Sequence, residues 1–343
     1  MQMVNLRKRG EKIRQFILDN VQSHPKVITR LAARKFGVSR QAINKHIKQL
    51  VSQKSITVKG ATSNRTYFLH PDVKEKFGYA IDNQIQEDVV WRNDILPLLG
   101  SLPDNVENIW NYCFSEILNN AIDHSNGFMI AVEIEKTAIA TEIRITDDGD
   151  GVFKKIQKGF GLIDERQAVL ELSKGKVTTD PENHTGEGIF FSSRMMEQFL
   201  ILSGSTYFSH NKKDDLDWII ENPPFEGTGV YMKMKNDTAR TVQKIFNQFA
   251  DPESEDYGFT KTIVPVNLVQ YGNEMLVSRS QAKRLLARVD QFKIVILDFK
   301  GVSAIGQAFA DEIFRVFAQR KTTTRIIPIN MNDSVQQMVI RAL

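Results

Sequence analysis

The sequence predicts a multidomain α+β protein built from three successive units. The first observation is an uneven charge distribution: residues 1–70 hold 15 Lys and Arg against two acidic residues, a net charge of +13, whereas the remainder holds 30 against 39, a net charge of −9. The second is a polar stripe on a predicted helix, 115–124, followed by an Asp- and Gly-rich turn at 147–151. The third is an alternation of strand-like and helical runs after residue 255, which indicates a small α/β unit.

Composition excludes several classes of protein. With 343 residues and one cysteine, Cys113, the chain has room for two or three cores but carries neither an internal disulfide framework nor a cysteine-cluster zinc site. We expect Cys113 to be buried as a small apolar side chain. No apolar run approaches the roughly 18 residues that span a bilayer, and the N-terminal segment is charged. We therefore expect a cytoplasmic protein with no membrane partner.

Residues 1–70 read as three helices followed by a hairpin. Ile13, Phe16, Ile17 and Val21 recur at helical spacing, and Pro25 ends that helix. A second helix is expected over 28–36 before Gly37, and a third over 40–53, with Ser39 as its N-cap. Two strand-like runs, 55–58 and 65–69, then flank the turn at 60–64.

This segment resembles the winged helix-turn-helix family over roughly its whole length. The resemblance implies that the third helix enters the major groove of double-stranded DNA and that the hairpin meets phosphates. The high positive charge favours DNA over the alternative, a winged helix used only for protein contacts. The implied DNA-binding residues are Arg40, Gln41, Asn44, Lys45, Lys48, Lys59 and Arg65.

The central segment, about 78–238, reads as an α/β sandwich with a mainly antiparallel sheet. Helices are expected at 87–99, 105–124 and 189–198, and strands at 129–134, 141–145, 199–203, 217–221 and 229–234. A long loop-rich region is expected over 152–183.

The helix at 105–124 carries polar side chains that suit a nucleotide site. Glu116, Asn119, Asn120 and Asp123 fall at i, i+3, i+4 and i+7, so they share one face. Carboxylates and carboxamides hold Mg²⁺ and orient water, whereas an ordinary wet helix face carries mixed charges. In the later turn, Asp147 places an acceptor beside glycines that a ligand can approach closely.

Four motifs in this order resemble the GHKL ATPase superfamily, the Bergerat-fold group that includes gyrase B subunits, MutL proteins and histidine kinases. They are Glu-x-x-x-Asn-Ala-x-Asp at 116–123, Asp-x-Gly-x-Gly at 147–151, Gly-x-Gly at 186–188 and Gly-Thr at 227–228. The resemblance covers residues 78–238 and implies that ATP and Mg²⁺ are the cofactors.

The resemblance assigns a role to each matching residue. Asn120 would bind Mg²⁺ through its amide oxygen, and Glu116 would be the catalytic residue that polarises the attacking water. Asp147 would accept a hydrogen bond from the adenine amino group. The remaining residues implied to bind the cofactor are Gly149 and Gly151 near the base, Gly186 and Gly188 at the phosphates, and Thr228, which would support Asp147 through a water.

Several neighbours have plainer interpretations. The side chain of Asn119 is also suited to a local hydrogen bond. No role is assigned to Asp123. A histidine at the C-terminal end of a helix, such as His124, interacts favourably with the helix dipole. Residues 152–185 would form the lid, where Lys174 and Lys176 are either phosphate clamps or ordinary exposed lysines. Glu116 in the base position favours hydrolysis, and no helical domain with a phospho-accepting histidine is evident, which argues against a histidine kinase.

Residues 255–343 read as a small α/β unit that resembles STAS-like domains of the kind appended to bacterial GHKL proteins. Strands are expected at 260–266, 293–299 and 325–330, and helices at 278–288, 306–320 and 334–341. STAS domains are implied to bind protein partners and to be phosphorylated on a serine at a helix start. Here that position is Gly306-Gln307-Ala308, so the usual phosphorelay is not expected.

Together the resemblances imply an ATP-binding, slowly hydrolysing regulator of transcription of bacterial type. Nucleotide state would control the arrangement of the domains, and with it the spacing of two DNA-binding heads in a homodimer. Two alternatives stay open: a serine/threonine protein kinase of the anti-sigma-factor type and an ATP-binding scaffold without catalysis. The role of the last domain, the DNA sequence and the signal are not determined by the sequence.

Overall fold

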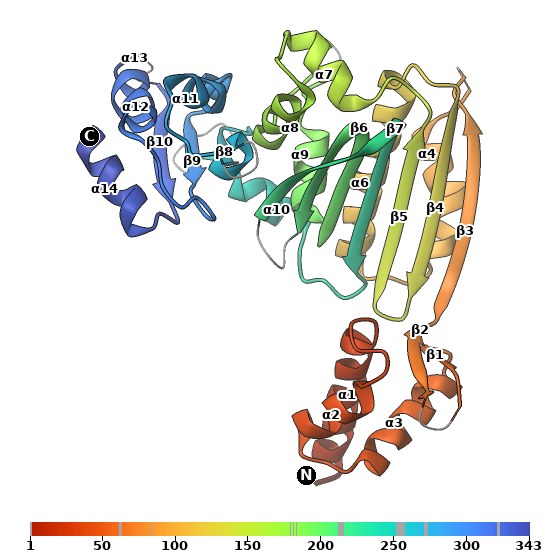
Figure 1. Cartoon of the computed structure of the whole chain (residues 1–343). Helices are drawn as coiled ribbons and strands as arrows, with labels where there is room; N and C mark the ends of the chain where they lie inside the picture. The colour runs from red at the N-terminus through yellow and green to blue at the C-terminus, as the bar shows by residue number, and fades with distance from the viewer. Residues whose placement is uncertain are drawn as a thin grey trace.

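The computed structural model contains several sheets in three units (Figure 1). The N-terminal unit ends at residue 69, the central unit runs from 71 to about 250, and the C-terminal unit runs from 258 to 343. The N-terminal unit lies at one end of the large sheet, and the C-terminal unit lies beside its helices. The structure describes residues 2–61, 64–82, 84–178, 180, 182, 184–211, 216–251, 258–270, 274–320 and 323–343.

The N-terminal unit has the predicted order of three helices and a hairpin. Its helices are α1 (Gln2–Val21), α2 (Ile28–Phe36) and α3 (Arg40–Ser52), and its strands are β1 (Ile56–Lys59) and β2 (Thr66–Leu69). Gly37 ends α2 in the left-handed region at φ 61°, and the Ser39 hydroxyl accepts a 3.2 Å hydrogen bond from Ala42 N at the start of α3. Ile17, Ile28 and Ile43 are fully buried in a core whose buried residues all belong to this unit.

The central unit is built on a five-stranded antiparallel sheet of order β3-β4-β5-β7-β6. The strand β3 (Pro71–Ala80) was not predicted, and the two strands expected at 217–221 and 229–234 are one strand, β7. Lys74 and Lys76 of β3 pair with Glu135 and Glu133 of β4 at 2.9 and 2.8 Å. The other strands are β4 (Met129–Thr137), β5 (Ala140–Asp147), β6 (Gln198–Asn211) and β7 (Leu216–Lys235).

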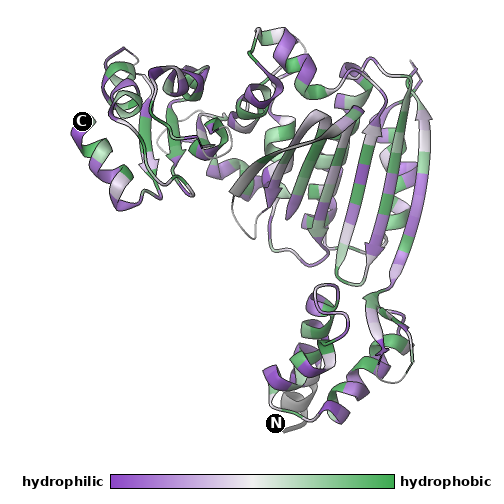
Figure 2. Ribbon diagram, viewed as in Figure 1, coloured by the Kyte–Doolittle hydropathy of each residue, from purple (hydrophilic) through white to green (hydrophobic). Residues whose placement is uncertain are grey.

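Helices cover one face of this sheet (Figure 1). The long helix α6 (Asp104–His124) buries Trp110, Phe114 and Leu118 against the sheet, and the sheet strands alternate apolar and polar side chains (Figure 2). Cys113 of α6 is buried as expected, and burial raises its pKa to about 12. The neighbouring helical segments are α4 (Glu87–Val90), a π-helical stretch (Trp91–Ile95), α5 (Leu96–Leu99), α9 (Gly188–Met195) and α10 (Val242–Gln248).

The segment that follows β5 is helical, so the expected loop-rich region is wrong. It forms α7 (Val152–Phe160) and α8 (Glu165–Lys174). The three glycines of this segment suggested a loop, but Gly161 ends α7 in the left-handed region at φ 60°. Asp164 then caps α8 by accepting a 2.9 Å hydrogen bond from Gln167 N. Most of α8 is buried.

The C-terminal unit is a small α/β unit, as the strand–helix alternation predicted, and its three-stranded sheet is parallel with the order β10-β9-β8. A capping box between Ser278 and Gln281 starts the first helix. Its strands are β8 (Lys261–Pro265), β9 (Ile294–Asp298) and β10 (Arg325–Ile329). Its helices are α11 (Arg279–Leu286), α12 (Gln307–Ala310), a π-helical stretch (Asp311–Phe317), α13 (Ala318–Arg320) and α14 (Asp333–Ala342).

The central and C-terminal units share one hydrophobic core. Aromatic rings carry it across the boundary: the Phe190 centroid lies 4.9 Å from Phe249 and 4.6 Å from Phe259. Phe259 in turn lies 5.1 Å from Phe292 of the C-terminal unit. Ring contacts of this kind are worth about 0.5–1.5 kcal/mol each beyond the area they bury. These two units are therefore packed as one body.

The N-terminal unit is attached to the central unit at two places. His70 alone separates β2 from β3, so the hairpin leads directly into the edge strand of the sheet. At the second place, Ile139 of the β4–β5 turn packs against the N-terminal core, and Asp19 lies 3.6 Å from Lys235.

Candidate functional site

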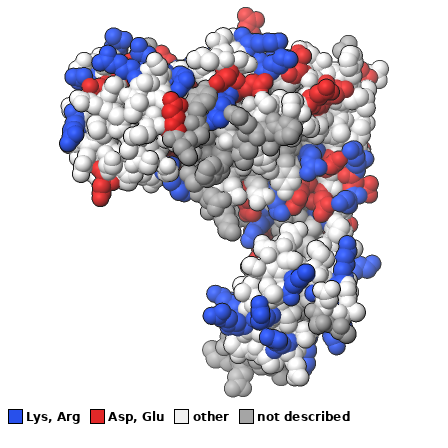
Figure 3. All heavy atoms as spheres, viewed as in Figure 1, with Lys and Arg blue, Asp and Glu red and all other residues white. Residues whose placement is uncertain are grey.

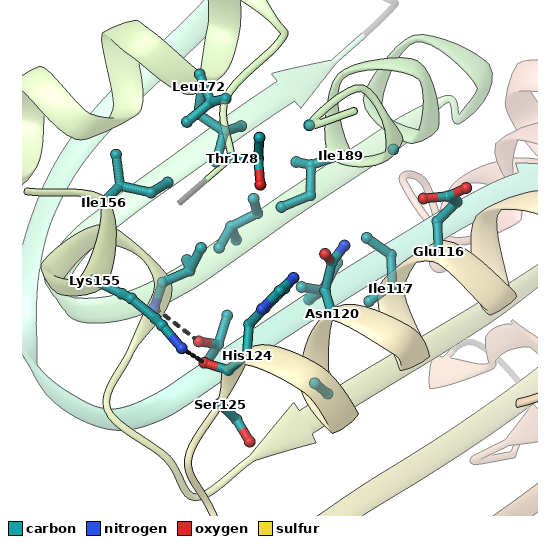
Figure 4. Close-up of a pocket in the computed structure, with 18 of the residues that line it drawn as sticks. Glu116, Ile117, Asn120, His124, Ser125, Lys155, Ile156, Leu172, Thr178 and Ile189 are labelled. Carbon is teal, nitrogen blue, oxygen red and sulfur yellow. Dashed lines mark hydrogen bonds between the residues drawn. The ribbon is translucent and has the colours of Figure 1, made fainter. Parts of the chain in front are cut away.

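A cavity of about 310 Å³ lies between the sheet and the helices α6, α7, α8 and α9. Its volume suits a small organic ligand. Figure 4 shows its residues converging from segments that are far apart in the sequence. Seven of the residues predicted from the sequence line it: Glu116, Asn120, Asp147, Gly151, Gly186, Gly188 and Thr228.

The helix α6 presents a row of polar side chains to the cavity. Glu116, Asn120 and His124 are spaced by four residues, so they lie one above another along the cavity wall (Figure 4). Asn119 and Asp123, which share the predicted polar face, are not among the described lining residues. Asp123 is exposed, and its Oδ2 lies 3.9 Å from His184 Nε2.

Asp147 is the last residue of β5 and lines the cavity. Its side chain is only 6% exposed, and its Oδ1 accepts hydrogen bonds from Gly149 N at 3.0 Å and Thr228 N at 3.2 Å. Thr228 therefore contacts Asp147 directly through its backbone, whereas the contact implied by the resemblance runs through a water. Burial raises the pKa of Asp147, and these two N–H donors oppose the rise.

The two glycines after Asp147 have different positions. Gly151 lines the cavity at φ 85° and faces Ser203, so a side chain there would collide. Gly149 does not line it: a Cβ on Gly149 would overlap the carbonyl of Ser125. Gly149 thus makes room for the α6–β4 connection.

Gly186, just before α9, and Gly188, its first residue, also serve the packing of the cavity wall. Gly186 is in the left-handed region at φ 70°, and its carbonyl accepts a 3.1 Å hydrogen bond from Val177 N. A Cβ on Gly188 would overlap Glu116 Oε2, so this glycine leaves space for the carboxylate. Gly188, Ile189 and Phe190 at the start of α9 line the same cavity, and the start of a helix suits an anion.

Charge and burial oppose each other around Glu116. Burial raises the pKa of Glu116, the nearby His184 lowers it and Glu187 raises it. Burial also raises the pKa of Glu187. Burial lowers the pKa of His124, and His184 and Lys155 lower it further, so this imidazole is neutral at pH 7. A carboxylate in such a place is a stronger proton acceptor than one in water.

Sequence reasoning missed several residues of the cavity wall. His184 lies against His124 with ring centroids 4.4 Å apart, and Lys155 donates a 2.6 Å hydrogen bond from Nζ to the carbonyl of His124. Both come from the region that was expected to be a loop-rich lid. His124 was interpreted as a helix end, although its i+8 spacing from Glu116 placed it on the same face.

Neither lysine considered as a phosphate clamp lines the cavity. Lys174 is 1% exposed, and its Nζ donates a 2.7 Å hydrogen bond to Glu171, so the alternative of an exposed loop lysine is also wrong. Lys176 lies over the rings of Phe259 and Phe292, with Nζ 5.6 and 5.1 Å from their centroids. Both lysines face the C-terminal unit.

The oxygen atoms of the cavity suit a metal ion only in part. Within the described residues, no group of three or more His, Cys, Asp and Glu side chains is arranged to hold a metal. Mg²⁺ commonly takes one or two protein oxygens and completes its shell with water and phosphate. Asn120, with its amide in the cavity beside Glu116, fits that limited role.

The residues predicted to contact DNA are all exposed. Five lie on the outer face of α3, opposite the buried Ile43 and Ile47, and two lie on the hairpin. Lys59 Nζ sits 5.5 Å from the Phe68 ring centroid. Figure 3 shows Lys and Arg gathered on the visible face of the N-terminal unit. The seven residues are Arg40, Gln41, Asn44, Lys45, Lys48, Lys59 and Arg65.

One comparison with known families gives a match, and it covers the C-terminal unit. Residues 281–336 match the family described as STAS-like domain of unknown function (DUF4325). The C-terminal unit is therefore STAS-like. A comparison with curated proteins gives no match. In the described part of the chain, no helix combines the length and apolar character needed to cross a membrane.

The STAS-like unit has no serine at the start of α12, the position that the resemblance to STAS domains implies for phosphorylation. The N-cap there is Gly306, whose N–H donates a 2.8 Å hydrogen bond to Leu276 O. A Cβ on Gly306 would fall 2.9 Å from Val277 Cα, so the segment before α11 occupies the space of a side chain. No hydroxyl stands at 306–308.

Proposed function

We propose that this protein is an ATP-binding, DNA-binding regulator of the GHKL type, in which the bound nucleotide controls the arrangement of the domains. The observation that carries the proposal is the cavity itself. Glu116, Asn120, Asp147, Gly186 and Gly188 converge on it from three separate segments of the chain. These are residues to which the GHKL motifs assign nucleotide contacts.

The two ends of the cavity suit the two ends of a nucleotide. Asp147 is a nearly buried acceptor held by two backbone N–H groups, and it matches the amino group of adenine. A carboxylate has about four acceptor positions, so it can bind a ligand in addition to these donors. At the other end, Asn120 and the start of α9 offer an amide oxygen and N–H groups that suit Mg²⁺ and phosphate.

Glu116 is placed to act on water at the phosphate end. When bound with Mg²⁺, ATP supplies the phosphoanhydride that hydrolysis cleaves. Glu116 orients the attacking water and accepts its proton, and the burial that raises the pKa of this carboxyl makes it a better acceptor. His124 is neutral and adds no charge. Turnover is slow, as befits a switch.

The N-terminal unit supports the DNA part of the proposal. Its helix α3 is exposed along one face, capped by Ser39 and followed by a hairpin with Lys59 and Arg65 at its end. With a net charge of +13 in residues 1–70, this unit favours a polyanion. The winged helix-turn-helix arrangement that we propose would place α3 in the major groove.

The nucleotide proposal is tested with full-length protein by calorimetric titration of ATP with Mg²⁺ and by phosphate release. We expect Glu116→Gln to retain binding and lose hydrolysis by about 100-fold or more. Asp147→Asn turns an acceptor into a partial donor and should weaken binding by about 10–100-fold. Asp148→Asn is the matched control, because Asp148 is exposed and lies outside the cavity lining.

Three results would redirect this proposal. Equal ATP binding by the Asp147 and Asp148 variants, or no binding by the native protein, contradicts a nucleotide site here. Labelled phosphate that appears on a protein acceptor indicates the serine/threonine kinase. Binding with no turnover in either native protein or Glu116→Gln indicates the scaffold.

The DNA proposal is tested by the salt dependence of duplex binding. Replacing Lys45 and Lys48 with Gln removes two charges from the exposed face of α3, so the slope of log K against log salt should fall by about 2. Replacing the exposed Lys244 of α10 with Gln is the control and should leave the slope unchanged. Absent or salt-insensitive binding of a random duplex would refute the proposal.

A further inference from the structure

One wall of the cavity is attached to the C-terminal unit through a buried lysine. Lys174, at the end of α8, donates from Nζ to Glu171 Oε1 at 2.7 Å, to Ala287 O at 2.8 Å and to Arg284 O at 3.3 Å. The two carbonyls belong to the C-terminal end of α11 and the turn after it. A buried ammonium is costly unless its donors are satisfied, so this geometry fixes how the two units dock.

The backbone around Lys174 is held by the same unit. Thr262 of β8 is fully buried and donates from Oγ1 to Lys174 O at 2.6 Å. Arg288 donates from Nη2 to Lys176 O at 3.1 Å, and its guanidinium lies 4.1 Å from the Phe160 ring centroid of α7. The segment from α7 to residue 178 is thus anchored on its outer side by STAS-like residues.

The anchored segment is followed in the sequence by residues 184–188, which contain Gly186 and Gly188 and which we call the glycine loop. Leu172, Val177 and Thr178 line the cavity, and Val177 donates its N–H to Gly186 O at 3.1 Å. A Cβ on Gly186 would overlap the Val177 backbone, so the two segments that contain these residues are in close contact. A displacement at Lys174 therefore reaches the phosphate end of the cavity within a few residues.

We propose that the STAS-like unit sets the nucleotide affinity of the cavity, with Lys174 as the positioning residue that fixes Val177 and, through it, Gly186. This inference rests on the proposed nucleotide site and adds its regulation. A partner that shifts β8 or α11 loosens the glycine loop and weakens nucleotide binding. By thermodynamic reciprocity, bound nucleotide strengthens the docking of the STAS-like unit to the same extent.

The test uses a matched pair at Thr262, which lies in the STAS-like unit and outside the cavity lining. Thr262→Val removes the hydroxyl that holds Lys174 O with little change in volume, whereas Thr262→Ser keeps the hydroxyl. In full-length protein we expect Thr262→Val to bind ATP with Mg²⁺ about fivefold more weakly or worse, and Thr262→Ser to restore the affinity. Hydrogen exchange at amides 175–178 and 186–188 should be faster in Thr262→Val only.

A second pair of variants keeps the inference testable if Thr262→Val, a substitution in the core, does not fold. Arg288 is partly exposed, with 30% side-chain exposure, so Arg288→Gln is tolerated more readily and removes the contact to Lys176 O. Arg279→Gln, on the exposed start of α11, is its control. We expect weaker nucleotide binding and faster glycine-loop exchange for Arg288→Gln and native behaviour for Arg279→Gln.

The two proposals fail in different ways. Unchanged affinity and unchanged loop exchange in folded Thr262→Val and Arg288→Gln overturn the regulatory inference and leave the nucleotide site standing. If the native protein binds no ATP, the nucleotide site is refuted, and the regulation of that site falls with it. Loop exchange that still responds to Thr262→Val would then show only mechanical coupling between the two units.

Discussion

At the residue scale, Glu116 combines a position in the cavity wall with an environment that disfavours its charge. Its carboxylate occupies the space left by Gly188 and lies near Glu187, whose pKa is also raised by burial. Desolvation and like charge both disfavour the ionised form. Burying such a carboxylate costs folding free energy, and a bound cation would offset part of that cost.

The cost of ionising Glu116 predicts a pH-dependent stability. Because the folded-state pKa is raised above the ordinary value of 4.5, the stability that this group contributes is present below pH 4.5 and is lost as pH rises through the folded value. We expect Glu116→Gln to unfold at a higher temperature than the native protein at about pH 8 and at the same temperature near pH 4. Thermal unfolding across this range, without nucleotide, measures the difference.

The exposed Glu11→Gln variant serves as the reference for that series. It should follow the native protein at every pH. A Glu116→Gln curve that also follows the native protein throughout would show that the carboxyl is well solvated, contrary to the burial seen here.

At the element scale, sequence patterns predicted the helices and strands whose signals are local. Ser39 and Gly37 mark the turn between α2 and α3, and the apolar run of β9 marks a central strand. The strand β3 was not predicted because its lysines pair with glutamates of β4, and only the folded sheet brings these side chains together. In the site, spacing found Glu116 and Asn120, whereas His184 enters through a tertiary contact that no local pattern encodes.

The contact between α6 and α9 gives a prediction at this scale. Gly188→Ala puts a methyl group where Glu116 Oε2 lies, so the carboxylate must move. We expect hydrolysis to fall by about tenfold or more, because the orientation of the water is lost, while ATP binding changes little. Gly161→Ala is the control: it meets no atom within 4 Å and costs only backbone strain at φ 60°. Equal hydrolysis by native protein and Gly188→Ala would mean that Glu116 does not act on water.

At the whole-molecule scale, charge and packing divide the chain differently. Charge separates the basic N-terminal unit from the rest, and the N-terminal core is also separate. Packing joins the other two units, although the sequence placed a domain boundary between 238 and 255. The local strand and helix patterns on either side of that boundary gave no sign that Phe190, Phe249, Phe259 and Phe292 form one aromatic cluster.

Truncation distinguishes the two kinds of boundary. A fragment that ends at residue 250 uncovers Phe190 and Phe249, and we expect it to aggregate or to lose its cooperative unfolding transition. A fragment of residues 1–70 keeps its own core and should fold alone. Size-exclusion chromatography and circular dichroism on both fragments measure this. A stable, monomeric 1–250 fragment would contradict a shared core.

The double attachment of the N-terminal unit limits the directions in which it can move. One attachment is covalent, at His70 between β2 and β3, and the other is the packing of Ile139 with the Asp19–Lys235 pair beside it. Two fixed points define an axis, and a body held at both retains a single rotation about it. The surface of α3 that we propose to bind DNA would therefore swing along one arc, so the proposed nucleotide signal would be delivered as an angle of the N-terminal unit.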